Sequence, residues 1–166
     1  MAKYEFTGET ETFMGRTLHR IRAVVEIASL GVAIGQLGGW IEKPSNLAQV
    51  HGNAWVFGDA RVFGDARVFG NARVFGNAQV HGDARVSGNA RVYGDARVFG
   101  NAQVHGDARV SGNAQVHGDA WVSGNAQVHG DAWVFGNAWA SGYALTFWTA
   151  HKTTIMALAD TKAAQS

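Results

Sequence analysis

Alanine, valine and glycine recur along most of the chain at intervals of six residues. From Leu47 to Gly142 the sequence is an unbroken run of hexapeptides of the form (Asn/Asp)-Ala-x-Val-x-Gly, such as NAWVFG, DARVFG and NAQVHG. Alanine and valine stand two residues apart, so a strand places both on one face and the residues between and after them on the other. Glycine followed by Asn or Asp is typical of a turn, because these residues tolerate left-handed backbone angles. The pattern therefore predicts a short strand and a corner in every hexapeptide.

One such strand cannot bury its apolar face alone, so successive coils must stack. The sequence itself repeats best at twelve residues, because NAQVHGDARVSG at 77–88 recurs at 101–112. A two-sided coil of that length would stack five arginines in one column and leave a small core. An 18-residue coil breaks up this column and enlarges the core. We therefore predict an all-β, three-sided parallel β-solenoid with 18 residues per coil, and we interpret the twelve-residue similarity as a record of duplication.

The two ends of the chain depart from the repeat. Residues 1–30 are predicted to form a small N-terminal antiparallel β cap, in which 4–8 and 11–15 pair with 17–27. Residues 31–46 are expected to make an irregular first coil, with Trp40 plugging the base of the core. Residues 143–166 are predicted to be a C-terminal cap or tail. Within this tail, 143–150 would finish the last coil, and 151–166 would form a short helix with Ile155 and Met156 facing inward.

The composition of the chain excludes several classes of function but says little about the fold. The 166 residues suit one domain, and 14 Lys and Arg against 13 Asp and Glu give a net charge of +1. This balance disfavours a globally basic nucleic-acid binder. The absence of cysteine excludes disulfides, thiolate zinc sites and a cysteine nucleophile. The first residues lack the basic start and apolar run of a signal peptide, and no stretch approaches the ~20 apolar residues of a membrane span. We therefore expect a cytoplasmic protein.

The array resembles the hexapeptide-repeat family of left-handed parallel β-helices. That family has an aliphatic residue followed by a small residue four places later, which Val56 with Ala60 and Val62 with Ala66 match. Glycine here falls one place later than in the family. Together with the segment 35–56, this variant is similar to uncharacterised hexapeptide-repeat proteins of enterobacteria and their phages. The resemblance covers about 23–142 and implies a left-handed coil, a homotrimer and a phage or prophage origin.

Two outward columns are expected on each side of the prism. The residue before valine is Arg, Gln or Trp, and the residue after it is Phe, His, Ser or Tyr. Exposed aromatic ladders of this size are unusual on a monomer, and arginine beside an aromatic ring is typical of interface hot spots. We expect the side with the densest aromatic run and three successive arginines to bind a partner. Its residues are Trp55, Phe57, Arg73, Phe75, Arg91, Tyr93 and Arg109.

Three other functions compete with this interpretation. Many relatives in the resembled family are acyltransferases with a histidine base, but the histidines here recur at one repeat position and no protruding loop interrupts the array. No tetrahedral metal-ligand spacing is evident. A nucleotide or nucleic acid could instead bind where arginines neighbour Phe75 and Tyr93. The sequence thus predicts neither catalytic residues nor a metal or cofactor.

The favoured hypothesis is a non-enzymatic binding or structural protein. Its arginine and aromatic sides would hold copies of itself, as a homotrimer, or a host protein complex that it inhibits in the host cytoplasm. Nucleic-acid or nucleotide binding stays the first alternative and a trimeric acyltransferase the second.

Overall fold

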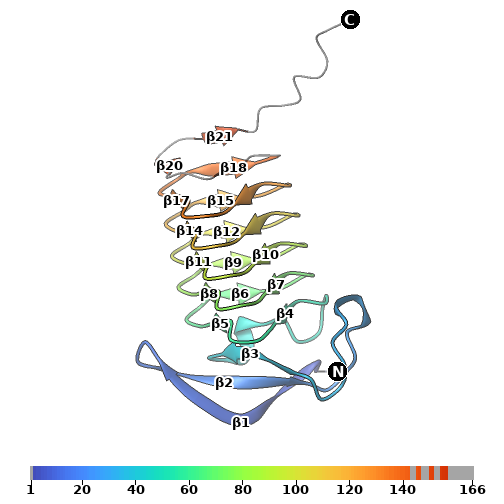
Figure 1. The fold of residues 1–166 in the computed structure, drawn as a ribbon. Coiled ribbons are helices and arrows are strands. Elements are labelled where there is room, and N and C mark those ends of the chain that lie inside the picture. Colours follow the sequence, from blue (N-terminus) through green and yellow to red (C-terminus); the bar gives the residue numbers. More distant parts are fainter. Residues whose placement is uncertain (1, 143–144, 147–149, 152–153, 157–166) are drawn as a thin grey trace, which may run out of the picture.

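The computed structural model describes residues 2–142, 145–146, 150–151 and 154–156. Its coils stack into a solenoid of about six turns, which rises from the N-terminal hairpin to the last strands in Figure 1. Three sheets run along it, one per side of the prism, and their stacked coils pair in parallel. The prediction of an all-β solenoid with three sides is confirmed. The left-handed winding stays a prediction from the family resemblance.

Most strands are two residues long, because each ends where the next corner begins. Side 1 consists of β4 (Trp55–Val56), β7 (Arg73–Val74), β10 (Arg91–Val92), β13 (Arg109–Val110), β16 (Gln127–Val128) and β19 (Leu145–Thr146). Side 2 begins with β1 (Tyr4–Phe13), β2 (Arg16–Ala23) and β3 (Leu37–Ile41), and continues with β5 (Arg61–Val62), β8 (Gln79–Val80), β11 (Arg97–Val98), β14 (Gln115–Val116), β17 (Trp133–Phe135) and β20 (Ala150–His151). Side 3 consists of β6 (Arg67–Val68), β9 (Arg85–Val86), β12 (Gln103–Val104), β15 (Trp121–Val122), β18 (Trp139–Ser141) and β21 (Thr154–Met156). Two 3₁₀ turns, η1 (Ala28–Leu30) and η2 (Pro44–Asn46), lie before the regular coils.

Each coil contains 18 residues, as the strand register shows. Arg91 pairs with Arg73 in the coil below and Arg109 in the coil above. The rungs between coils are backbone hydrogen bonds, such as the one that the Arg85 amide donates to the Ala102 carbonyl at 2.9 Å. The twelve-residue coil is excluded by this register.

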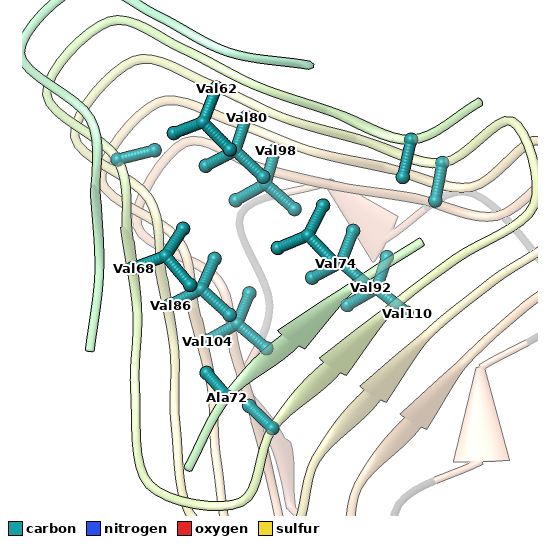
Figure 2. Close-up of a cluster of buried hydrophobic side chains, with 14 of the residues drawn as sticks. Val62, Val68, Ala72, Val74, Val80, Val86, Val92, Val98, Val104 and Val110 are labelled. Carbon is teal, nitrogen blue, oxygen red and sulfur yellow. The ribbon is translucent and has the colours of Figure 1, made fainter. Parts of the chain in front are cut away.

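The core is built almost entirely from valine and alanine. Figure 2 shows three columns of valine that point into the prism, one from each sheet. The repeat alanines and valines from Ala54 to Val134, for example Val98, have 0 or 1% of their surface exposed. Among the described residues the only buried polar or charged side chains are Lys3 and Asn46, and both lie before the regular coils.

The glycine at each corner has a positive φ angle, and at most corners the next coil also leaves no room for a side chain. Gly88 has a φ of +65°, and a Cβ atom there would lie 2.9 Å from the amide nitrogen of Gly106. A side chain would thus strain the backbone and push the coils apart.

An antiparallel cap closes the lower end, as the sequence predicted. β1 pairs with β2, β2 pairs antiparallel with β3, and β3 starts the parallel stack by pairing with β5. The prediction that Trp40 plugs the base of the core is wrong. Trp40 is half-buried on the outer surface, where the Arg20 guanidinium lies 5.1 Å from its ring. Ile21 and Ile41, both fully buried, belong to the core instead. Alternation along β3 turns its isoleucine inward and therefore its tryptophan outward.

The first predicted hexapeptide does not form a regular coil. Leu47 bridges to Val68, at the position that an 18-residue coil would give to Val50. Val50 is 66% exposed as a result. Gln49, which precedes Val50 and is therefore expected to point outward, accepts a hydrogen bond from the Lys3 amide at 3.1 Å. The regular array therefore begins at β4, after the predicted boundary.

At the upper end, strands continue beyond the last hexapeptide, which ends at Gly142. β19, β20 and β21 continue the three sheets, and Ile155 pairs with Ala140. The prediction of a helix is therefore wrong for residues 154–156. The remainder of the predicted helix lies outside the described residues.

Candidate interaction surface

The side-1 face is formed by six residues that the sequence assigned to partner binding. They are Phe57, Arg73, Phe75, Arg91, Tyr93 and Arg109, and all are half-buried or exposed. They share one face because the residues on either side of each inward valine point outward. The structure thus places these six together as predicted. Whether they bind a partner stays a prediction.

The arginines of this face form an unneutralised column. Arg73, Arg91 and Arg109 are in-register neighbours on β7, β10 and β13. Their backbones are therefore about 4.8 Å apart. None of the three forms a salt bridge within the described part of the chain, whereas Arg61 on side 2 is held by Glu11 at 2.6 Å. At this spacing like charges repel by roughly 1 kcal/mol in water, so the column favours an anionic partner.

Aromatic rings flank the arginines and border a hollow. Phe75 and Tyr93 stack with parallel planes and centroids 4.8 Å apart. Phe57, Arg73 and Phe75 line a shallow hollow of about 340 Å³. Two apolar walls and one guanidinium suit a group that is partly apolar and carries a negative charge.

Trp55, the seventh predicted site residue, does not belong to the exposed face. It has 0% of its surface exposed, because the N-terminal segment covers it. The Tyr4 ring packs edge-on against the indole with centroids 6.3 Å apart. Tyr4 is itself fixed by its hydroxyl, whose single proton is shared between the carbonyls of Pro44 and Leu47 at 3.1 and 3.2 Å. The role predicted for Trp55 is therefore corrected: it anchors the cap.

Side 2 carries a continuous stack of rings that the sequence analysis did not single out. Phe63, His81, Phe99, His117 and Phe135 lie one above another, with centroid separations from 4.7 to 5.3 Å and interplanar angles from 7 to 11°. Phenylalanine and histidine alternate at every step. The 18-residue spacing of these residues was a readable signal, since it places the two ring types in one column.

Burial in this stack affects the charge of its histidines. Desolvation lowers the pKa of His81, and the nearby guanidinium groups of Arg97 and Arg16 lower it further. Desolvation also lowers the pKa of His117. The folded protein therefore binds fewer protons at these two sites than the unfolded chain at mildly acidic pH.

The chain should lose stability as the pH falls below the unfolded histidine value of about 6.5. Because folding lowers the pKa of these histidines, their contribution to the free energy of unfolding is complete above the unfolded value of about 6.5. This contribution is lost as the pH falls through the lower pKa of the folded state. Urea unfolding at pH 7.5 and at pH 5 measures the stability lost between the two pH values. This loss should be smaller for His81→Phe/His117→Phe, which keeps the rings stacked, than for the wild type. An equal loss in both proteins would contradict the assignment, and His105→Phe is the control outside the stack.

Side 3 is divided between arginine and tryptophan. Arg67 and Arg85 are in-register neighbours, and the Arg67 guanidinium lies 5.8 Å from the Phe69 ring centroid. Higher up, Trp121 and Trp139 stack with centroids 5.4 Å apart, and Trp139 is 49% exposed. Side 3 has two successive arginines where side 1 has three, and its stacked tryptophans lie above these arginines rather than beside them.

The comparison with protein-family models agrees with this architecture. A family described as YdcK Beta solenoid repeat matches residues 66–82, 84–98, 90–106, 102–118 and 114–130. These segments lie within the stacked parallel coils of the three sheets. The chain is a β-solenoid repeat protein. No curated protein sequence matches it.

Neither a metal-binding cluster nor a membrane-spanning helix occurs in the described part of this β-solenoid. Within residues 2–142 and the three short described strands beyond them, no group of three or more His, Asp or Glu side chains could hold a metal ion. In the same part of the chain, no helix is long and apolar enough to cross a membrane.

Proposed function

We propose that this β-solenoid is a non-enzymatic assembly and binding protein, whose copies associate side by side through the side-1 face into a homotrimer. The observation that carries the proposal is the column of Arg73, Arg91 and Arg109, which has no salt bridge among the described residues and is flanked by the stacked Phe75 and Tyr93. Arginine beside aromatic rings is the chemistry of interface hot spots.

A protein partner suits this face better than solvent does. Carboxylates from a second protein would relieve the repulsion within the arginine column, and apolar side chains would cover Phe57 and Phe75 at the hollow. Neither gain needs a conformational change, because the coils hold the residues in fixed register. A preformed surface loses little entropy on association.

Nucleic-acid binding is less well supported by the same geometry. Phe75 and Tyr93 already use one face each to stack on one another, so few ring faces are left for bases. The net charge of +1 gives little long-range attraction for a polyanion. Salt-dependent oligonucleotide binding that Arg91→Ala abolishes would reverse this ranking.

An acyltransferase is also the weaker alternative. His81 and His117 lie inside a ring stack rather than beside an orienting carboxylate. A general base needs such a partner and a substrate pocket. Turnover of an acyl-CoA donor by the purified protein would overturn the non-enzymatic assignment.

The narrower role, a phage-encoded inhibitor of a host protein complex in the host cytoplasm, rests on the family resemblance. It would use the sides that the trimer leaves open, such as the tryptophan column of Trp121 and Trp139. A pull-down from host lysate that returned only the protein itself would count against it.

Light scattering after gel filtration tests the assembly. The wild type should have three times the 17.7 kDa mass of one chain, and Arg91→Glu/Tyr93→Ser should be monomeric because it removes a central charge and a ring from the side-1 face. The matched control Arg85→Glu changes an arginine of side 3 and should leave the trimer intact. A monomeric wild type would refute the proposal.

A further inference from the structure

The three corner columns of the prism differ in charge. Each consists of the Asn or Asp residues that follow the corner glycines. The column between sides 1 and 2 contains Asp59, Asn77, Asp95, Asn113 and Asp131. The column between sides 3 and 1 contains Asn53, Asn71, Asn89, Asp107 and Asn125. The column between sides 2 and 3 contains Asp65, Asp83, Asn101, Asp119 and Asn137.

Ring closure restricts which corner can meet the side-1 face. In a threefold ring, the directions from one subunit to its two neighbours are about 60° apart. In a prism with three equal sides, the normal of a face and either adjacent corner are also about 60° apart, whereas the opposite corner is about 180° away. A face-to-corner contact therefore closes into a trimer only through a corner that borders side 1. The column between sides 2 and 3 would produce an open row.

The level of the carboxylate distinguishes the two bordering corners. On the corner between sides 3 and 1, Asn71 and Asn89 stand at the levels of Arg73 and Arg91, and the carboxylate of Asp107 stands at the level of Arg109, the last arginine of the column. A carboxylate at the level of Arg91, the middle arginine, has an arginine both above and below that level. The corner between sides 1 and 2 carries the carboxylate of Asp95 at the level of Arg91, only four residues further along the same coil. A pure rotation about the threefold axis keeps each residue at its own height. It therefore brings the Asp95 of one copy to the level of the Arg91 of the next.

Asp95 is available for such a contact. Its Oδ1 accepts a hydrogen bond from the Asn77 amide at 3.0 Å, which leaves acceptor sites on the carboxylate. Within one chain, Asp95 and Arg91 form no salt bridge in the described structure, although they flank the same corner. The fold thus presents a fixed carboxylate beside one face and unneutralised guanidinium groups on that face.

We propose that in the trimer the corner between sides 1 and 2 of each copy docks on the side-1 face of the next, with Asp95 placed among Arg73, Arg91 and Arg109. This inference rests on the proposed function and specifies its contact surface. Each copy supplies one face and one corner, so three identical contacts satisfy every copy. The alternation of Asn and Asp in the docking column leaves Arg73 and Arg109 facing the amides of Asn77 and Asn113.

Charge reversal tests the docking without altering the core. Asp95→Arg should weaken trimer formation at least tenfold, measured by light scattering over a dilution series, because it places a fourth positive charge beside the column. Asp119→Arg is the matched control: Asp119 accepts an equivalent hydrogen bond from Asn101 at 2.9 Å but lies on the corner opposite side 1. It should leave the mass unchanged. Circular dichroism checks that both variants keep their strands.

The double variant Arg91→Asp/Asp95→Arg should recover the trimer, since it exchanges the two charges across every contact. A trimer that tolerates Asp95→Arg, or one that only Asp119→Arg breaks, would overturn the docking while leaving the proposed assembly intact. Failure of the double variant to recover, with strands retained, would also overturn it. A monomeric wild type would refute the proposed function and this inference together.

Discussion

Val98→Asp is expected to lower the free energy of unfolding by more than about 4 kcal/mol, because it leaves an unpaired carboxylate in an apolar interior. Val98 has no exposed surface and lies between Val80 and Val116 in the side-2 column. Only valine and alanine side chains from the repeat surround this part of the core, so no donor is available to the carboxylate. Solenoid coils contact only their neighbours, and a defect in a middle coil removes two interfaces at once.

Urea unfolding followed by circular dichroism measures this loss. The matched control Val98→Thr keeps the branched shape but adds a neutral hydroxyl, and it should cost about 1 to 3 kcal/mol. Similar losses for Asp and Thr would contradict the closed core, because they would mean that water reaches position 98. A second transition at low urea in Val98→Asp would indicate that the coils on the two sides unfold separately.

The fold was predictable because one physical argument decides each repeated position. Val, Ala and Gly recur with the period of a strand and a corner, and the repulsion between stacked arginines selects 18 residues per coil over twelve. Arg61 indeed has Gln79 above it, and Gln79 is followed by Arg97. The sequence similarity at twelve residues then has a structural effect beyond duplication. Since a coil holds three hexapeptides, two alternating kinds place unlike residues above one another where the alternation is kept, as on side 2, whereas side 1 departs from it and stacks Arg73, Arg91 and Arg109.

The errors lie where the repeat meets other parts of the chain. Val50 matches the motif, yet Leu47 takes its place against Val68 because the preceding cap determines where the chain enters the first coil. Trp55 is outward on its strand, as predicted, but the cap packs over it. Both outcomes depend on contacts between distant segments, and residue periodicity carries no information about those contacts.

The sequence predicts which residues form the side-1 face but not how their charges are paired. The six exposed residues of the side-1 face follow directly from the 18-residue coil. Their lack of salt bridges among the described residues does not, because it depends on which acidic side chains the cap supplies. Glu11 reaches Arg61 on side 2, and no cap residue reaches Arg91. Side 1 is therefore left with its charges unneutralised.

The corner columns show how an alternating sequence stabilises the stacked coils. Asn77, Asn101 and Asn113 each donate a side-chain hydrogen bond to the Asp one coil above, at 2.9 to 3.0 Å. Each amide also separates two carboxylates, which stand two coils or about 9.6 Å apart, whereas carboxylates in adjacent coils would be about 4.8 Å apart. The same alternation that prevents repulsion thus provides a ladder of charge-assisted hydrogen bonds along the corners.

Asn101→Asp should accordingly destabilise the fold by about 2 kcal/mol near pH 7, because it creates two new carboxylate pairs that each repel by about 1 kcal/mol in water. The substitution inserts a carboxylate between Asp83 and Asp119, so that the column becomes acidic without interruption from Asp65 to Asp119, and it removes the hydrogen bond to Asp119. Asp119→Asn is the matched control, since it keeps the amide ladder and adds no charge. It should have little effect on the urea midpoint.

The pH dependence separates repulsion from a loss of packing. The penalty of Asn101→Asp should be smaller in strong acid than at neutral pH, because a protonated carboxyl carries no charge and does not repel its neighbours. High salt should reduce it as well, because these side chains are exposed to solvent. A loss of stability that neither acid nor salt diminishes would show that the asparagine acts through its shape. The alternation along the corners would then have no electrostatic role.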